Sequence, residues 1–199
     1  EGGLSAKNNL EKSLTDERSA VAAEANRLAA ESKTLLDLIA KLEDDAANVV
    51  PRTKPGTTAR PAPSVTLPDG VKRFADAKGH MMRPVSGKIL RGFGSGEKGL
   101  TFSGRNNGQV LAPYAGRVEF SGPFKNYDKV VILNVGDGYF VLLTGLNDLF
   151  VGAGDDVRRG EPVGRLPNGS APELYIELRK DGSVVNPSPW LTDAQVNSG

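Results

Sequence analysis

The first fifty residues of the chain carry apolar side chains at a helical spacing. Proline is absent between residues 4 and 50, and the last glycine before the helix pattern is Gly3. A seven-residue repeat predicts a helix that would be about 70 Å long if unbroken, at about 1.5 Å per residue. The repeating positions and the residues that widen their stripe are Leu10, Leu14, Val21, Leu28, Leu35, Leu38, Ile39, Leu42 and Val49.

The second stripe of this segment is polar. Glu17, Glu24 and Glu31 stand where a two-stranded coiled coil would place apolar partners. We therefore interpret residues 1–50 as a helical, coiled-coil-type segment that forms one arm of a hairpin or docks elsewhere. A helix packed on its own domain is the alternative.

Prolines then interrupt the chain. Pro51 ends the helical pattern, and Pro55, Pro61, Pro63 and Pro68 follow among threonine, arginine and glycine. Residues 51–69 therefore read as an extended linker.

Residues 70–199 carry short apolar runs separated by glycine-rich turns. This spacing predicts a mainly β domain, partly closed or built as a β-sandwich. The predicted strands are Lys88–Arg91, Arg117–Ser121, Lys129–Val135, Tyr139–Leu143, Pro162–Leu166 and Leu174–Arg179.

Composition narrows the possible functions. The chain has 199 residues, 38% apolar and 25% charged, with a formal net charge of +1. Residues 1–50 have a net charge of −4 and the remainder +5, which is too mild for a nucleic-acid-binding protein. The absence of cysteine excludes disulfides, thiolate metal sites and a cysteine nucleophile. Without a start methionine at Glu1, we expect a piece of a longer protein that has lost its targeting signal.

Few residues offer catalytic chemistry. His80 is the only histidine and has no cysteine or nearby carboxylate with which to close a zinc site. Ser103 lacks the surroundings of a nucleophile elbow. The stretch from Gly92 to Gly96 has the glycines of a phosphate loop but not its lysine, so a turn is the better interpretation.

One segment resembles a cofactor-carrier hairpin. Residues 154–164 look like a hairpin of lipoyl and biotinyl domains, which modify a lysine at a tight turn. Lys129 opens an apolar strand instead, so this interpretation is weak and no cofactor is expected.

A longer set of markers covers about 110 residues in order, from Met82 to Leu191. Through them the domain resembles the LytM (M23) family of zinc endopeptidases, which cut peptidoglycan cross-bridges. The markers are Pro84-Val85-Ser86-Gly87-Lys88-Ile89, Phe93-Gly94, Gly99-Leu100, Val110-Leu111-Ala112-Pro113, Gly116-Arg117-Val118, residues 130–138, residues 157–164, Glu173-Leu174-Tyr175-Ile176-Glu177-Leu178-Arg179 and Asn186-Pro187.

The resemblance also assigns the metal and catalytic positions. Glu97 and Thr101 fall on the early His-x-x-x-Asp pair of active members, Gly145 on the mid-domain histidine, and Glu173 and Tyr175 on the His-x-His pair. Thr, Tyr and Gly cannot replace imidazole as zinc ligands. The resemblance therefore implies a degenerate site without metal or catalysis, although Glu97 and Glu173 could together hold a hard cation.

Within the family, the loss of these residues is typical of EnvC-like murein hydrolase activators. The C-terminal phrases 173–179 and 184–191 are similar to that branch, as is the order of helix, linker and LytM-like domain. The resemblance implies a periplasmic protein that activates N-acetylmuramoyl-L-alanine amidases at the division septum. It also implies recruitment through the helical arm by an FtsEX-type complex, and a resting state in which a helix occupies the groove.

The amidase is expected to bind in the vacant active-site groove. On the predicted strand Leu174–Arg179, alternation places the leucines and Ile176 in the core and the polar residues on the groove face. A passive peptidoglycan-binding module and a hydrolase with an unrecognised site remain the alternatives. The expected groove residues are Lys98, Thr101, Tyr127, Val130, Leu143, Tyr175 and Arg179.

Overall fold

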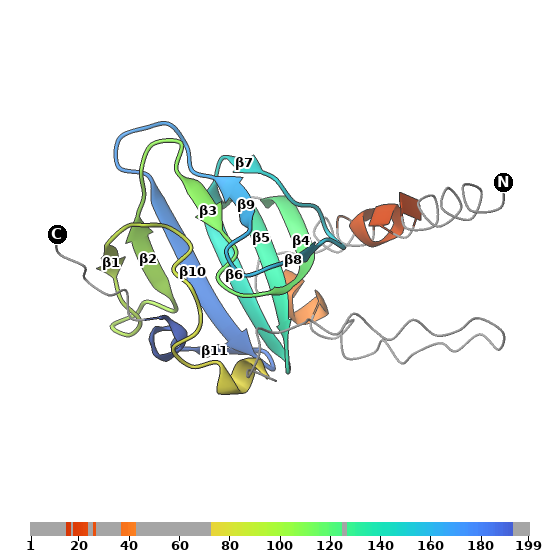
Figure 1. The fold of residues 1–199 in the computed structure, drawn as a ribbon, viewed down its shortest axis with the longest axis horizontal. Helices are drawn as coiled ribbons and strands as arrows, with labels where there is room; N and C mark the ends of the chain where they lie inside the picture. Colours follow the sequence, from red (N-terminus) through yellow and green to blue (C-terminus); the bar gives the residue numbers. More distant parts are fainter. Residues whose placement is uncertain are drawn as a thin grey trace, which may run out of the picture.

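The computed structural model describes residues 15–16, 18–23, 26, 37–42, 73–124 and 127–192, in which two β-sheets dominate (Figure 1). The larger sheet has eight strands in the order β1-β2-β10-β6-β5-β4-β8, and β11 pairs with β10. The smaller sheet has the order β3-β9-β7 and crosses one face of the larger one. The strands are β1 (Ile89–Arg91), β2 (Leu100–Ser103), β3 (Gln109–Leu111), β4 (Gly116–Phe124), β5 (Tyr127–Gly136), β6 (Tyr139–Leu146), β7 (Asp148–Leu149), β8 (Asp156–Val157), β9 (Pro162–Arg165), β10 (Glu173–Lys180) and β11 (Ser183–Val185).

All six predicted strands are present, and most are longer than predicted. Five others, β2, β3, β7, β8 and β11, were not predicted; each has only two to four residues, which is short for a periodic signal. The predicted hairpin over residues 154–164 is wrong. There β8 pairs with β4, whereas β9 pairs with β3 and β7 in the other sheet.

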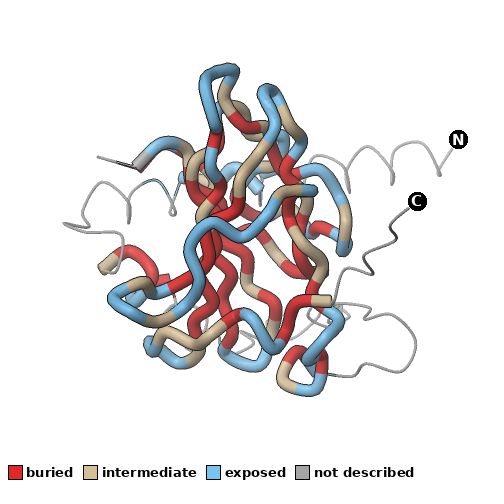
Figure 2. Tube along the Cα trace, turned by 90° about the vertical axis from the view of Figure 1, so that its left-hand side faces the viewer, coloured by how far each residue is buried: buried red, intermediate tan, exposed pale blue. Residues whose placement is uncertain are grey.

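The core lies between the two sheets, on what we call the inner face of the large sheet. Leu174, Ile176 and Leu178 alternate into it from β10 and are completely buried, as predicted. Buried residues run along the middle of the strands, and exposed ones gather in the connecting loops (Figure 2). Two 3₁₀ turns, η1 (Phe74–Asp76) and η2 (Ser188–Trp190), close one end of this core, because Trp190 Nε1 donates to the carbonyl of Phe74 at 3.2 Å.

The opposite, outer face carries a second apolar cluster to which the N-terminal segment contributes. Leu38, Ile39 and Leu42 are at most 5% exposed and pack with apolar residues of the sheet. Burying three such side chains is worth about 1.5–3 kcal/mol each, which fixes the segment on the sheet. The sheet residues of this outer cluster are Phe120, Phe124, Val130, Ile132, Phe140 and Leu142, with Ala153 beside them.

The described part of the N-terminal segment is helical at 15–16, 18–23, 26 and 37–42. Arg18 forms an ion pair with Asp155 at 3.4 Å, so the stretch around 18–23 also contacts the domain. The rest of the predicted helix, and the whole linker 51–69, lie outside the described residues. Within the described part, no helix is long and apolar enough to cross a membrane.

Candidate functional site

A row of side chains crosses the outer face of the large sheet. Cross-strand pairing aligns Thr101 of β2 with Tyr175 of β10, Tyr175 with Thr144 of β6, and Thr144 with Val130 of β5. Residues paired directly across strands point to the same face of a sheet. The register therefore brings together three of the predicted groove residues, which are 29 or more positions apart in sequence.

A chain of polar contacts runs along β10 from this row. The Tyr175 hydroxyl donates to Glu177 Oε2 at 2.7 Å, and Arg179 Nη1 donates to Glu177 Oε1 at 2.8 Å. Arg179 Nη2 donates to the carbonyl of Gly182 at 2.6 Å. Glu177 and Arg179 are only 5% and 7% exposed, so this is a buried ion pair. We call Thr101, Thr144, Tyr175, Glu177 and Arg179 the polar strip.

An arginine bridges two carboxylates at one end of the strip. Arg91 Nη2 lies 2.5 Å from Glu173 Oε2, and Arg91 Nε lies 3.8 Å from Glu97 Oε1. The three side chains are 41–50% exposed, so the pairs add little stability. The pairs do affect the local charge. The Arg91 guanidinium already occupies the position between Glu97 and Glu173 at which a cation would bind both carboxylates.

Two glycines allow the strands to approach at this site. A Cβ on Gly145 would lie 2.5 Å from the carbonyl oxygen of Glu173, and Gly145 has a φ of +95°. A Cβ on Gly99 would lie 2.9 Å from the Tyr175 ring, so the ring lies against that glycine. The backbone at these two positions therefore excludes any side chain without a local shift.

Residues 95–187 match the peptidase family M23. The chain contains an M23 peptidase-type domain. It is 32% identical over 149 residues to the murein hydrolase activator EnvC of Escherichia coli, a match that covers 70% of this chain. The matched part spans only 36% of that protein's own length.

Solved structures agree on the fold of the M23-type domain. Helicobacter pylori Csd3 superposes with a TM-score of 0.52 at 19% identity, covering 59% of this chain and 38% of that one. A zinc-containing peptidase from Vibrio cholerae superposes with a TM-score of 0.50 at 17% identity, covering 56% and 40%. At these identities the likeness establishes the fold alone.

The five metal and catalytic positions that the resemblance assigned lie close together in the M23-type domain. Thr101 and Tyr175 are cross-strand partners, Gly145 touches the backbone of Glu173, and Arg91 joins Glu173 to Glu97. Among the described residues, no three His, Cys, Asp or Glu side chains are grouped as a metal site.

The predicted groove residues are only partly brought together. Leu143 is a correction, because it pairs with Ile176 and Val131 and is completely buried in the inner core. The sequence alternation places Thr144, not Leu143, on the outer face. Lys98 is exposed in the turn before β2, and the side chain of Tyr127 lies outside the described residues.

Two further predicted groove residues are on the expected face but not accessible. Val130 is completely buried in the outer cluster with Leu38 and Ile39. Arg179, which the sequence analysis expected to be presented for binding, is buried with Glu177. Val130 packs under Leu38 and Ile39 of the N-terminal segment, and Arg179 contacts Glu177 and the carbonyl of Gly182. Strand alternation alone reveals neither set of contacts.

The other chemical candidates fall outside this site. His80 is exposed, and its Nδ1 lies 3.0 Å from the carbonyl of Lys78. Ser103 accepts a hydrogen bond from the amide of Lys88 at 2.9 Å. Lys129 lies within β5 and its Nζ contacts the carbonyl of Asn147, which does not fit a modified lysine at a tight turn.

The sequence analysis placed Glu177 on the groove face but did not expect its pairing with Arg179, and it missed Arg91 and Thr144. Thr144 lies beyond the predicted strand Tyr139–Leu143, and only the register of β6 with β10 places it beside Tyr175. Arg91 gave no signal in the sequence, since its role depends on the irregular pairing of β1 with β2.

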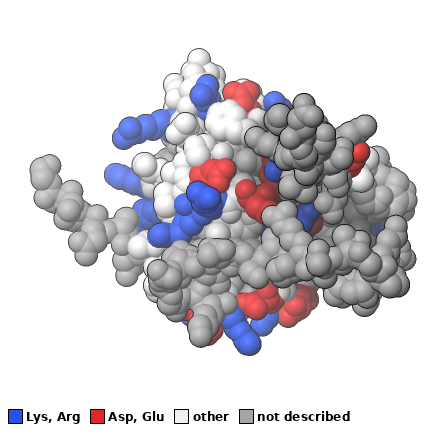
Figure 3. Space-filling view, turned by 45° about the vertical axis from the view of Figure 1, so that its right-hand side comes forward, with Lys and Arg blue, Asp and Glu red and all other residues white. Residues whose placement is uncertain are grey.

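Charge is uneven over the surface: Lys and Arg project along the left-hand edge of one face, and Asp and Glu gather nearer its middle (Figure 3).

Proposed function

We propose that this protein is a non-catalytic activator of N-acetylmuramoyl-L-alanine amidases that split septal peptidoglycan during cell division. It would act in the periplasm, at the division septum, by binding the amidase through the polar strip and its surroundings. The similarity to a murein hydrolase activator supports the class of function. The polar strip contains no histidine and no metal-ligand group of three, and its threonine and tyrosine side chains support binding rather than catalysis.

The proposal rests mainly on the pairing of Arg91 with Glu97 and Glu173, at positions that the M23 resemblance assigns to metal binding and catalysis. Hydrolysis by a zinc peptidase needs a metal ion that activates water. Here Thr101, Gly145 and Tyr175 offer no imidazole, and Arg91 is paired with both Glu97 and Glu173. Its guanidinium offsets part of the charge of the two carboxylates and disfavours a second cation, so the site lacks the ligands for zinc.

The same surface suits a peptide partner. Tyr175 is half-buried and provides a large, rigid contact area at little entropic cost. Lys98 is exposed nearby and would favour an amidase segment with an acidic flank. An amphipathic helix laid across the row of Thr101, Tyr175 and Thr144 fits this combination.

The N-terminal helical segment would regulate this binding. Leu38, Ile39 and Leu42 cover the outer cluster, and Val130 of that cluster belongs to the same row as Tyr175. A partner that needs the whole row must displace the segment first. An FtsEX-type complex acting on the helical arm would supply that displacement.

The experiment is amidase stimulation by the purified protein. Dye release from labelled cell walls is measured with an N-acetylmuramoyl-L-alanine amidase of the same organism, with and without this chain. We expect no release by the chain alone and increased release by the pair. Tyr175→Ala should abolish the increase while the domain stays folded, although the loss of the hydrogen bond to buried Glu177 lowers its thermal stability. His80→Ala, on an exposed turn outside the strip, should change neither.

Two outcomes contradict the proposal. The first is wall digestion by the chain alone that a chelator abolishes. The second is pelleting with cell walls but no effect on any amidase, which would favour a passive peptidoglycan-binding module.

A further inference from the structure

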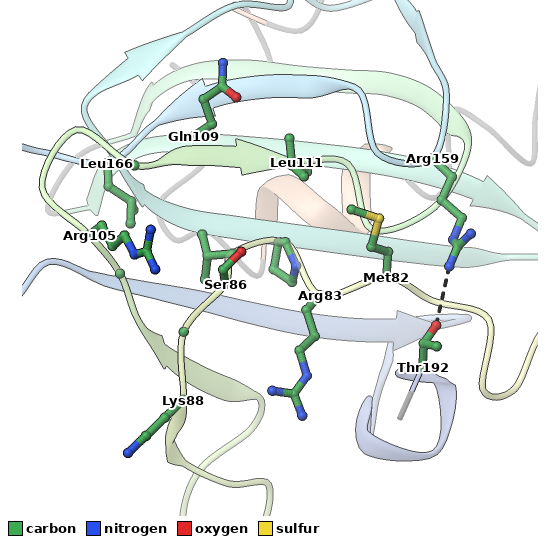
Figure 4. Close-up of a pocket in the computed structure, with 15 residues that line it drawn as sticks. Met82, Arg83, Ser86, Lys88, Arg105, Gln109, Leu111, Arg159, Leu166 and Thr192 are labelled. Carbon is green, nitrogen blue, oxygen red and sulfur yellow. Dashed lines mark hydrogen bonds between the residues drawn. The ribbon is translucent and has the colours of Figure 1, made fainter. Parts of the chain in front are cut away.

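A cleft of about 820 Å³ lies apart from the outer face of the large sheet. Three groups of residues border it (Figure 4): residues 82–88; Gly104, Arg105, Gly108, Gln109 and Leu111; and Arg159, Leu166 and Thr192. None of them belongs to the polar strip or to the outer cluster. The volume is within the range of about 300–1,000 Å³ that is usual for small-ligand sites.

The charged side chains that line this cleft are all cationic. The lining includes Arg83, Lys88, Arg105 and Arg159, and no aspartate or glutamate. Figure 4 places Arg105 and Arg159 toward opposite ends, with Arg83 between them. Cations spread along a concave surface without counter-charges attract an elongated ligand that carries several anionic groups.

The hydrogen bonds of these arginines leave most of their donors available. Arg159 Nη2 donates to Thr192 Oγ1 at 3.4 Å, a long contact. Arg83 Nε is inaccessible to solvent and has no hydrogen-bond partner within the described part of the chain, so a ligand could reach only the other nitrogens of this guanidinium. A ligand anion would accept hydrogen bonds from the accessible guanidinium nitrogens of the cleft.

Between the cations the wall is apolar. Met82, Pro84, Val85, Leu111 and Leu166 provide it, and Val85 and Leu166 also belong to the inner core, which makes the wall rigid. A single phosphate or sulfate would leave this surface uncovered. A short peptide covers it with aliphatic carbons and presents carboxylates at intervals.

We propose that this cleft binds a short peptide that carries two or more carboxylates. Arginine forks match carboxylates in geometry, and their spacing along the cleft selects for several such groups in one molecule. The choice of peptide rests on the proposed function, because murein supplies stem peptides with several free carboxylates. Binding here would hold the protein on the wall while the outer face engages the amidase.

The test is isothermal titration calorimetry on the full chain. The probes are the synthetic stem peptide L-Ala-γ-D-Glu-meso-diaminopimelate-D-Ala and the same peptide with its carboxylates amidated. We expect one acidic peptide per chain, weaker binding at higher salt, and at least about tenfold weaker binding of the amidated form. Inorganic phosphate and phosphatidylglycerol vesicles serve as further probes and should not bind comparably.

The variants separate the cleft from surface charge in general. Arg105→Gln with Arg159→Gln should weaken binding of the acidic peptide about tenfold or more. Arg158→Gln removes an exposed arginine next to Arg159 that does not line the cleft, and should leave binding unchanged. Matching circular dichroism and thermal transitions show that the variants are folded.

Several results would overturn the inference: no binding of the acidic peptide, equal binding of the amidated form, or unchanged binding by the double variant. Binding of phosphate or of vesicles in preference to the peptide would also overturn it. Binding of the amidase in solution is measured in parallel with the double variant and should be unchanged, because the cleft lies apart from the polar strip. Peptide binding without any amidase stimulation by the wild type would sink the proposed function and leave this inference standing.

Discussion

Single residues on the outer face have environments that their positions in the sequence do not suggest. Arg179 and Glu177 both belong to the polar face of β10, yet each is almost completely buried and paired with the other. Buried ion pairs add little net stability, but removing one partner leaves the other charge uncompensated. The two residues must therefore be considered together.

Arg179→Ala should lower the free energy of unfolding by about 3–5 kcal/mol, because Glu177 keeps its charge in a buried position. Urea denaturation at pH 7 measures the loss. The double variant Glu177→Leu with Arg179→Met is the control and should recover most of it, since no unpaired charge remains. A loss below about 1 kcal/mol for Arg179→Ala would mean that the pair is hydrated in solution.

Tyr114 should make the domain sensitive to alkaline pH. Its side chain is 1% exposed, and burial raises the pKa of its hydroxyl above the usual value of 10.0, while the nearby Arg159 acts in the opposite direction. The folded protein therefore binds the proton more tightly than the unfolded chain. The contribution of Tyr114 to stability is fully present below pH 10.0 and is lost as pH rises from there through the raised pKa.

Tyr114→Phe tests this dependence. The ring keeps its edge-on contact with Phe74, at 5.0 Å between centroids, and loses only the hydroxyl. We expect a smaller decline in stability above pH 10.0 than in the wild type, measured by urea denaturation at successive pH values. Parallel declines in the two proteins would show that Tyr114 does not contribute.

At the scale of elements, the contact between β6 and β10 depends on Gly145. Gly145→Ala introduces a Cβ that would lie 2.5 Å from the carbonyl oxygen of Glu173, at a φ of +95°. Gly136→Ala is a matched control, because Gly136 has a φ of +91° and open space around it. We expect the strained backbone to lower the free energy of unfolding by about 1 kcal/mol in both variants. The clash should lower it by about 1–3 kcal/mol more in Gly145→Ala, as measured by thermal unfolding. Equal losses of stability in the two variants would mean that β6 shifts to accommodate the added Cβ without lowering stability.

The N-terminal helical segment should restrain partner binding as an element. Leu38→Glu with Ile39→Glu places charges in the outer cluster and should detach the segment, so that amidase binding increases. Ala40→Glu is the control, because Ala40 is exposed on the same stretch. Removal of residues 1–50 should have the same effect as the double variant. Affinities are compared at equal salt by calorimetry, and an unchanged affinity in both would reduce the segment to a spacer.

At the scale of the whole molecule, the purified protein should contain no stoichiometric zinc and should not digest peptidoglycan. The reason is the pairing of Arg91 with Glu97 and Glu173 at the positions that the M23 resemblance assigns to metal. Elemental analysis after dialysis against zinc, with wall digestion assayed in parallel, measures both. One tightly bound zinc per chain would show that the site is functional.

The sequence by itself determined the mainly β architecture, six of the eleven described strands and the inward face of β10. These features depend on local periodicity, since every second residue of a strand faces the same layer. The residue types at the positions that the M23 resemblance assigns to zinc can also be read from the sequence, and the loss of metal binding there stays a prediction. The family similarity was confirmed by the match to M23 and to a murein hydrolase activator.

Only the tertiary structure decided which side chains on the outer face are accessible and which are paired. Leu143 was placed on the wrong face because a family correspondence gives a position, whereas the register of β6 with β5 and β10 gives an orientation. The burial of Val130 depends on packing with residues about ninety positions away, at Leu38 and Ile39. The Arg91 pairs and the cationic cleft likewise join segments that have no common pattern in sequence, because electrostatic contacts depend on distance in space.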